Sequence, residues 1–165
     1  GKIDVKSTVD IGSVFSVLLT FRIGSKEKVS NKKEKLVELP LSERNILIVE
    51  DNKINQKVIA QLLTSWNCTF KIAENGQEGL QKLAKSSFDI ILMDLQMPVL
   101  DGYEAAKMIR EGFAGSQCKN IPIIALTADA FPETRKKVFD IGMNDFVSKP
   151  FKKDELNRKI HSLTS

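Results

Sequence analysis

The sequence has few of the residues that build disulfide-linked or metal-rich proteins. It holds two cysteines and one histidine among 165 residues. Cys68 and Cys118 lack the spacing of a metal motif, and we interpret them as reduced thiols rather than as a disulfide framework. A single histidine, His161, excludes a histidine-rich metal site, and its position predicts a surface residue of the last helix.

Long apolar runs are also missing. None reaches the roughly 18–20 residues that span a bilayer, and the longest candidate, residues 14–23, is interrupted by Ser16, Thr20 and Arg22. Residues 1–4 lack the start of a signal peptide, so the sequence predicts a cytoplasmic location and no membrane contact by these residues. Hydrophobic residues make up 42% and charged residues 28%, which is ordinary for a globular protein with a buried core.

The formal net charge of +4 is concentrated in one stretch. Five lysines between residues 26 and 35 carry much of the excess, and Glu27 and Glu34 lie among them. Interleaved charges of this kind are typical of a solvated linker. No nucleic-acid-binding motif accompanies them, so direct binding of nucleic acid is not expected.

The first 43 residues divide into a hairpin and a linker. Residues 2–7 and 13–23 are rich in β-formers, and the segment between them contains Gly12, which predicts a β-hairpin within residues 1–24. A lone hairpin is marginally stable in water, so it is predicted to be the end of a larger unit. Its unpaired edges can pack on a neighbour or pair with another copy. Residues 25–43 form the charged linker.

From Arg44 onward, short apolar runs alternate with helical patterns. Asn52, Asn75 and Asp101 are predicted helix N-caps. The alternation predicts an α/β fold, with an open parallel sheet covered by helices on both faces. The five predicted strands are Ile46–Val49, Thr69–Ala73, Phe88–Met93, Ile121–Leu126 and Asp145–Val147.

Residues suited to binding a cation or a phosphate end four of these runs. Glu50 and Asp51 directly follow the first run, Asp94 follows the third and Thr127 follows the fourth. Lys149 comes shortly after the fifth. Taken singly, each is equally well explained as a helix cap or a solvated side chain. In open parallel sheets, however, functional residues cluster at the carboxyl ends of the strands. The pattern therefore predicts that these side chains converge.

Three converging carboxylates repel one another, and burying them unpaired is unfavourable. A hard divalent cation offsets this charge, and Mg²⁺ takes one or two carboxylates together with a phosphate oxygen. The hydroxyl and the ammonium are placed to hold the other phosphoryl oxygens. Because phosphoryl transfer depends mainly on positioning and charge stabilisation, the set predicts that Asp94 accepts phosphate with the help of Mg²⁺.

Five motifs extend this pattern over residues 45–164. They are Ile46-Leu-Ile-Val-Glu-Asp-Asn52, Phe88-Asp-Ile-Ile-Leu-Met-Asp-Leu-Gln-Met-Pro98, Asp101-Gly-Tyr-Glu104, Ile121-Pro-Ile-Ile-Ala-Leu-Thr-Ala128 and Asp145-Phe-Val-Ser-Lys-Pro150. In residues, order and spacing they resemble the receiver domain of two-component response regulators. The resemblance implies a flavodoxin-like, doubly wound five-stranded parallel sheet of order 2-1-3-4-5 over residues 44–165.

The resemblance also implies roles for the acidic residues. Asp94 is the nucleophile that accepts phosphate from a phosphohistidine. Asp51 and Asp94 ligate Mg²⁺ together with the backbone carbonyl of Gln96. Glu50, which stands where aspartate also occurs in the family, helps to place the cation. Gln96 and Asp129 flank the water that attacks the phosphoaspartate, and we expect them to tune its lifetime.

The remaining implied roles fall at the ends of the last two strands. Thr127 moves to bond the phosphoryl group, and Lys149 pairs with the phosphoryl oxygens. Phe146 is the aromatic switch that turns inward as Thr127 moves. The peptide bond before Pro150 is cis in the family.

The predicted hairpin carries a second resemblance. Gly1-Lys-Ile-Asp-Val-Lys-Ser7 with Gly12-Ser-Val-Phe-Ser-Val-Leu-Leu19 is similar to the last two strands of a histidine-kinase ATP-binding domain. Kinase tail, linker and receiver follow one another in a hybrid histidine kinase, whose whole chain can be attached to a membrane. The donor is then the parent kinase's own histidine or a separate histidine phosphotransfer domain. The fragment itself is expected to catalyse only its own phosphorylation and dephosphorylation.

Two other functions compete with this interpretation. The first is a receiver-like interaction module that works without phosphorylation, against which the complete set of acids, Thr127 and Lys149 argues. The second is a hydrolase with an aspartyl-phosphate intermediate. Such enzymes typically have a second aspartate two residues after the nucleophile, where this sequence has Gln96.

Overall fold

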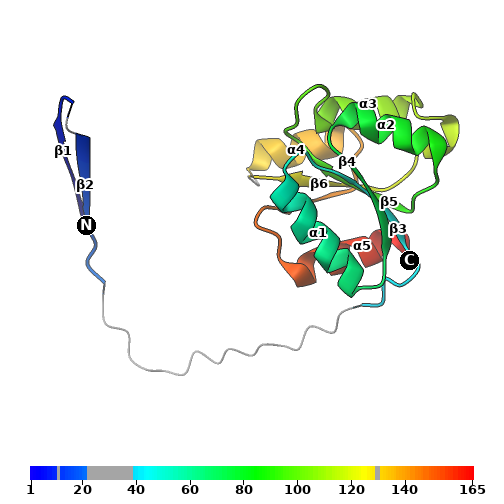
Figure 1. Ribbon diagram of the computed structural model, residues 1–165, viewed down its shortest axis with the longest axis horizontal. Helices are drawn as coiled ribbons and strands as arrows, with labels where there is room; N and C mark the ends of the chain where they lie inside the picture. The colour runs from blue at the N-terminus through cyan, green and yellow to red at the C-terminus, as the bar shows by residue number, and fades with distance from the viewer. Residues whose placement is uncertain (11, 22–38, 129–130) are drawn as a thin grey trace. The chain divides into compact units, whose positions relative to one another are not determined.

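The computed structural model describes residues 1–10, 12–21, 39–128 and 131–165. The described residues form two compact units, one on each side of residues 22–38. The first unit is a two-stranded antiparallel sheet, and the second is an α/β unit (Figure 1). The expected role of Asp129 falls outside the described residues.

The first unit is an amphipathic hairpin of β1 (Lys2–Thr8) and β2 (Gly12–Leu18). Ile3 pairs with Val17 and Val5 pairs with Phe15, which places all four side chains on one face. More than half of the surface of each of these side chains is exposed. The hairpin is therefore present as expected, with an apolar face open to solvent, although β2 ends at Leu18 and not at the predicted residue 23.

The second unit is built on a five-stranded sheet whose strands are all parallel. The strands lie in the order β4-β3-β5-β6-β7, which is the predicted order 2-1-3-4-5 when the five are counted from β3. Polar and apolar residues alternate in β4, as is typical of an edge strand, and β4 lies at the edge of the sheet. The strands are β3 (Asn45–Val49), β4 (Thr69–Ala73), β5 (Ile90–Asp94), β6 (Ile123–Thr127) and β7 (Asp145–Ser148).

Helices connect the strands. They are α1 (Lys53–Ser65), α2 (Gly76–Lys85), α3 (Gly102–Glu111), α4 (Pro132–Asp140) and α5 (Lys153–Thr164), with a 3₁₀ turn at Ser116–Cys118. The side chains of Asn52, Asn75 and Asp101 each accept a hydrogen bond from a backbone N–H in the first turn, so the three predicted N-caps are confirmed. Among the described residues, no helix has the length and apolar character needed to cross a membrane.

Each face of the sheet has its own apolar core. Leu47 and Val49 of β3 point to the face covered by α2, α3 and α4, whereas Ile46 and Ile48 point to the face covered by α1 and α5 (Figure 1). Strands β5 and β6 are buried along their whole length. Helices and apolar side chains therefore cover both faces of the sheet. Polar residues of the strands can reach solvent at the carboxyl ends of the strands.

The α/β unit begins before the expected boundary at Arg44. Leu41, assigned above to the linker, is 1% exposed and packs in the core beneath α1 and α5. The Asn157 amide on α5 accepts a hydrogen bond from the Leu39 N–H (2.9 Å) and donates one to the Leu39 carbonyl (3.1 Å). Residues 39–41 thus belong structurally to the second unit.

Candidate functional site

The carboxyl ends of the central strands bring three carboxylates together. Glu50 and Asp51 follow β3, and Asp94 is the last residue of β5. One carboxylate oxygen from each residue lies within 4.8 Å of the other two. Glu50 and Asp94 are buried and Asp51 is exposed, so the cluster opens to solvent on the side of Asp51.

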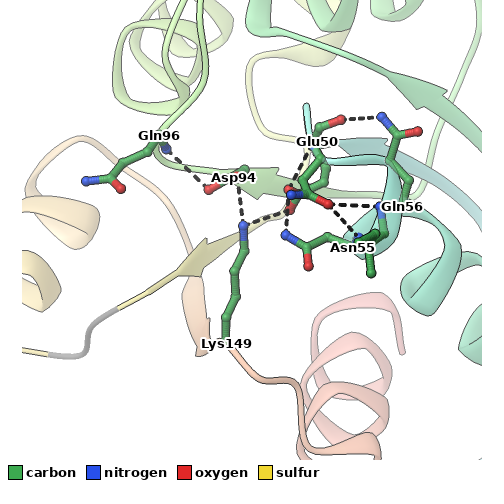
Figure 2. A network of polar contacts seen from close by, with 8 residues as sticks. Glu50, Asn55, Gln56, Asp94, Gln96 and Lys149 are labelled. Carbon is green, nitrogen blue, oxygen red and sulfur yellow. Dashed lines mark hydrogen bonds and ion pairs between the residues drawn. The ribbon is translucent and has the colours of Figure 1, made fainter.

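Lys149 lies between two of these acids. Its Nζ is 2.7 Å from Asp94 Oδ2 and 2.8 Å from Glu50 Oε2 (Figure 2). The contact with Glu50 is an ion pair and not a hydrogen bond, because Oε2 has no partner with hydrogen-bond geometry among the described residues. The backbone N–H of Lys149 donates to the Thr127 carbonyl at 2.7 Å, and the Lys149–Pro150 peptide bond is cis. The Lys149 ammonium thus lies beside both buried acids.

Two amides from the first turns of α1 hold Glu50. Asn55 Nδ2 donates to Glu50 Oε1 at 2.9 Å, and Gln56 Nε2 donates to the Glu50 backbone carbonyl at 2.6 Å (Figure 2). Sequence reasoning missed both residues. The available signal was Gln56, a polar residue that is buried on a helix face otherwise formed by Ile59 and Leu63.

Two groups of the site, the Glu50 carboxyl and the Lys149 ammonium, have shifted pKa values. Burial raises the pKa of the Glu50 carboxyl, although the Lys149 ammonium and the Asn55 amide act in the opposite direction. Burial alone would lower the pKa of Lys149, but its contacts with Asp94 and Glu50 outweigh burial and raise it. Lys149 is therefore firmly cationic at neutral pH and offsets part of the negative charge.

A small cavity of about 80 Å³ adjoins Asp94, and Gln96 and Thr127 also line it. Because a water molecule occupies roughly 30 Å³ in the liquid, the space suits a small group. The Gln96 N–H donates to Asp94 Oδ1 at 3.2 Å, while the Gln96 side chain is exposed. Tyr103 and Thr134 also line it, together with Leu95 and Ala128, and sequence reasoning gave Tyr103 and Thr134 no role.

Phe146 lies on β7, beside β6. Its backbone pairs with Ala125, two residues before the pairing of Ser148 with Thr127. The Phe146 ring is partly buried, with Arg135 of α4 at 4.8 Å and Lys159 of α5 at 5.0 Å from its centroid. Two cationic side chains thus contact the ring from two helices.

The donor set fits a hard divalent cation. Its three carboxylates supply oxygen ligands only, and Lys149 cannot balance all of their charge. No histidine or cysteine belongs to this cluster of described residues, which argues against a site for a softer metal. The cluster is therefore consistent with a site for a hard divalent cation such as Mg²⁺.

The comparisons with known proteins agree with this geometry. The family model of the response regulator receiver domain matches residues 46–161. Hybrid signal transduction histidine kinase K of Dictyostelium discoideum is 36% identical over 97% of this chain, which spans 14% of that relative. Probable histidine kinase 4 of Oryza sativa is 37% identical over 71% of this chain, which spans 13% of that relative.

Two solved structures bear on the site. A sensor histidine kinase receiver domain from Pseudomonas aeruginosa, crystallised with a magnesium ion coordinated in its active site cleft, is 39% identical, with a TM-score of 0.68 over 74% of this chain and 98% of its own. A receiver domain from Saccharomyces cerevisiae, co-crystallised with a histidine phosphotransfer signalling protein, is 35% identical, with a TM-score of 0.66 over 74% of this chain and 90% of its own.

Proposed function

This chain belongs to the response regulator receiver domain family, and we propose that it accepts a phosphoryl group from a phosphohistidine onto Asp94 in a phosphorelay of a hybrid histidine kinase. The observation that carries the proposal is the position of Asp94. Its carboxylate ends β5, groups with Glu50 and Asp51, and contacts Lys149 at 2.7 Å. A nucleophile, a cation site and a fixed ammonium thus share one sheet edge.

In the proposed reaction, an Asp94 carboxylate oxygen attacks the phosphorus of the phosphohistidine. A new P–O bond forms as the P–N bond breaks, and the electron pair of that bond stays on the histidine nitrogen. Glu50, Asp51, Asp94 and the backbone carbonyl of Gln96 would hold Mg²⁺. The ion supplies charge neutralisation for the phosphoryl oxygens.

The neighbouring residues would act on the phosphoryl group after transfer. Lys149 pairs with one phosphoryl oxygen, and the Thr127 hydroxyl bonds to another. Phe146 follows Thr127 as the switch. Gln96 and Asp129 control access of the water that hydrolyses the acyl phosphate. The cavity that Gln96 and Thr127 share with Asp94 supports the roles of these two residues.

The parent protein and the donor belong to the same proposal. The alignment with a hybrid histidine kinase covers 97% of this chain, which supports the hairpin of residues 1–24 as the end of a preceding kinase domain. Its apolar face would then pack against that domain and, in the isolated chain, would promote self-association. The donor is a kinase histidine or a histidine phosphotransfer domain. Such donors receive their phosphoryl group from ATP. We therefore place the receiver in the cytoplasm.

The direct test is phosphorylation with Mg²⁺ and acetyl phosphate, followed by mass spectrometry of the intact chain. We expect a gain of one phosphoryl group that requires Mg²⁺ and is abolished by Asp94→Asn. Asp140→Asn, at an exposed position of α4, is the matched control and should be phosphorylated normally. An unchanged mass with acetyl phosphate and with histidine-phosphorylated donors would favour the phosphorylation-independent module instead.

A further inference from the structure

Glu50 is the most constrained acid in the site. Its side chain is 0% exposed. Oε1 accepts hydrogen bonds from Asn55 Nδ2 at 2.9 Å and from the Asn52 N–H at 3.3 Å, while Oε2 faces Lys149 Nζ at 2.8 Å (Figure 2). The two oxygens therefore have different surroundings, one fixed by α1 and the other turned toward Lys149.

A glutamate needs such a fixture more than an aspartate does. Its chain has one more rotatable bond than that of aspartate, in addition to the broad last torsion that both side chains have. Without a fixed partner the carboxylate would sample several orientations around the cation site. Asn55 supplies that partner from the first turn of α1, whose N-cap Asn52 fixes the start of the helix.

Asn55 also has the right charge for this task. A neutral amide holds a carboxylate without repelling a bound cation, whereas Lys149 would repel one. Lys149 is moreover shared with Asp94 and is needed for the phosphoryl group in the proposed function. Asn55 is therefore the side chain that can keep Glu50 in place both before and after a cation binds.

We propose that Asn55 is a positioning residue that orients the Glu50 carboxylate for Mg²⁺ through the bond from Nδ2 to Oε1. The inference rests on the proposed function, because it assumes a cation at Glu50, Asp51 and Asp94. Gln56 has a different task, since it holds the Glu50 backbone carbonyl and not the carboxylate. Of these two adjacent amides, Asn55 thus binds the Glu50 carboxylate and Gln56 binds the Glu50 backbone.

Mg²⁺ affinity measured by isothermal titration calorimetry tests the proposal. Asn55→Leu keeps the size of the side chain and removes the donor, and we expect Mg²⁺ affinity to fall about 10-fold, the lower end of the range for lost partners of metal ligands. Gln61→Leu, at an exposed position of the same helix, should leave the affinity unchanged. Thermal unfolding without added Mg²⁺ shows whether either variant is misfolded.

A double-mutant cycle separates positioning from a general effect on the fold. If Asn55 acts through Glu50, Asn55→Leu should have no further effect on Mg²⁺ affinity in a Glu50→Ala background. An equal loss in both backgrounds would overturn the proposal. So would unchanged affinity of Asn55→Leu in a chain that otherwise binds Mg²⁺. Failure of the unaltered chain to bind Mg²⁺ would instead overturn the cation site itself, and with it the proposed function.

Discussion

Among single residues, Glu50 carries the sharpest conflict between folding and the proposed function. It is a fully buried acid beside a second buried acid, Asp94. Among the described residues, its carboxylate accepts hydrogen bonds from Asn55 and the Asn52 N–H and forms an ion pair with Lys149. Burial raises its pKa despite these contacts, so the folded chain favours the neutral form more than the unfolded chain does. The ionised carboxylate therefore lowers the stability of the fold, as would be expected of a group that serves the proposed cation site.

Glu50→Gln should expose this conflict. Above the raised pKa the buried charge is unfavourable, so without added Mg²⁺ the variant should be more stable than the unaltered chain at pH 7. This advantage should shrink as the pH falls through the raised pKa and vanish below 4.5, the ordinary value. Urea unfolding from pH 7 to pH 4 measures it, with the exposed Glu111→Gln as control.

Mg²⁺ should reverse the order of the two proteins. A ligand at 100 times its dissociation constant stabilises the folded state by about 2.7 kcal/mol, and the variant lacks one of the acids that attract the cation. An advantage for Glu50→Gln that grows on acidification would contradict the assignment of a raised pKa.

Val99 is a second residue whose conformation is unfavourable. It has φ 70°, in the left-handed region, and 83% of its surface is exposed. A β-branched residue is strained there, whereas asparagine adopts this region more readily. Val99→Asn should therefore raise the free energy of unfolding by about 1 kcal/mol, as measured by urea unfolding. The same change at the exposed helical Val58 should lower it, and stabilisation at both positions would mean that strain is not the cause.

At the scale of helices and strands, the apolar pattern was a good guide because both faces of the sheet are covered. The continuous runs at 46–49 and 88–93 became buried central strands, and the capping residues began helices where predicted. The pattern was a poorer guide to exposure. Ile54 continues the helical spacing of α1 but is 72% exposed. It lies in the first turn of the helix, and the spacing alone does not show whether a neighbouring element covers that turn.

Phe146 joins three elements, since α4 and α5 each direct a cation at its ring. Arg135→Gln removes one of them and should lower the free energy of unfolding by about 0.5–1 kcal/mol, as for other cation–π contacts at exposed sites. Lys136→Gln, at an exposed position next along α4, is the control. If the ring is the partner, Arg135→Gln should have no effect in a Phe146→Leu background, and an undiminished loss there would point to another contact of Arg135.

For the whole molecule, the sequence was sufficient to predict that the charged residues of the site lie close together. It was not sufficient to predict which other side chains hold them in position. Parallel strands carry their carboxyl ends to one edge, so Glu50, Asp94 and Lys149 were expected to converge and they do. The partners of Glu50 come from α1, and their geometry depends on how α1 packs. The helical spacing places Gln56 on the same face as Ile59 and Leu63, but it does not show which group the Gln56 amide contacts. Leu41 is one of a few apolar residues in a charged stretch, and the sequence does not show that it packs in the core of the α/β unit.

The position at which the α/β unit begins can be tested with two fragments. A fragment of residues 39–165 retains Leu41 in the core and the two hydrogen bonds between Leu39 and Asn157. A fragment of residues 44–165 loses all three, leaving a cavity and a buried amide without its partner. Removing a buried leucine side chain typically costs about 2–5 kcal/mol, so the free energy of unfolding of the shorter fragment, measured with urea, should be lower by that amount. The longer fragment should match the whole chain. Leu41→Ala in the whole chain should reproduce much of the loss, and Val9→Ala in the hairpin should leave this transition unchanged. Equal stability of the two fragments would place the boundary at Arg44 after all.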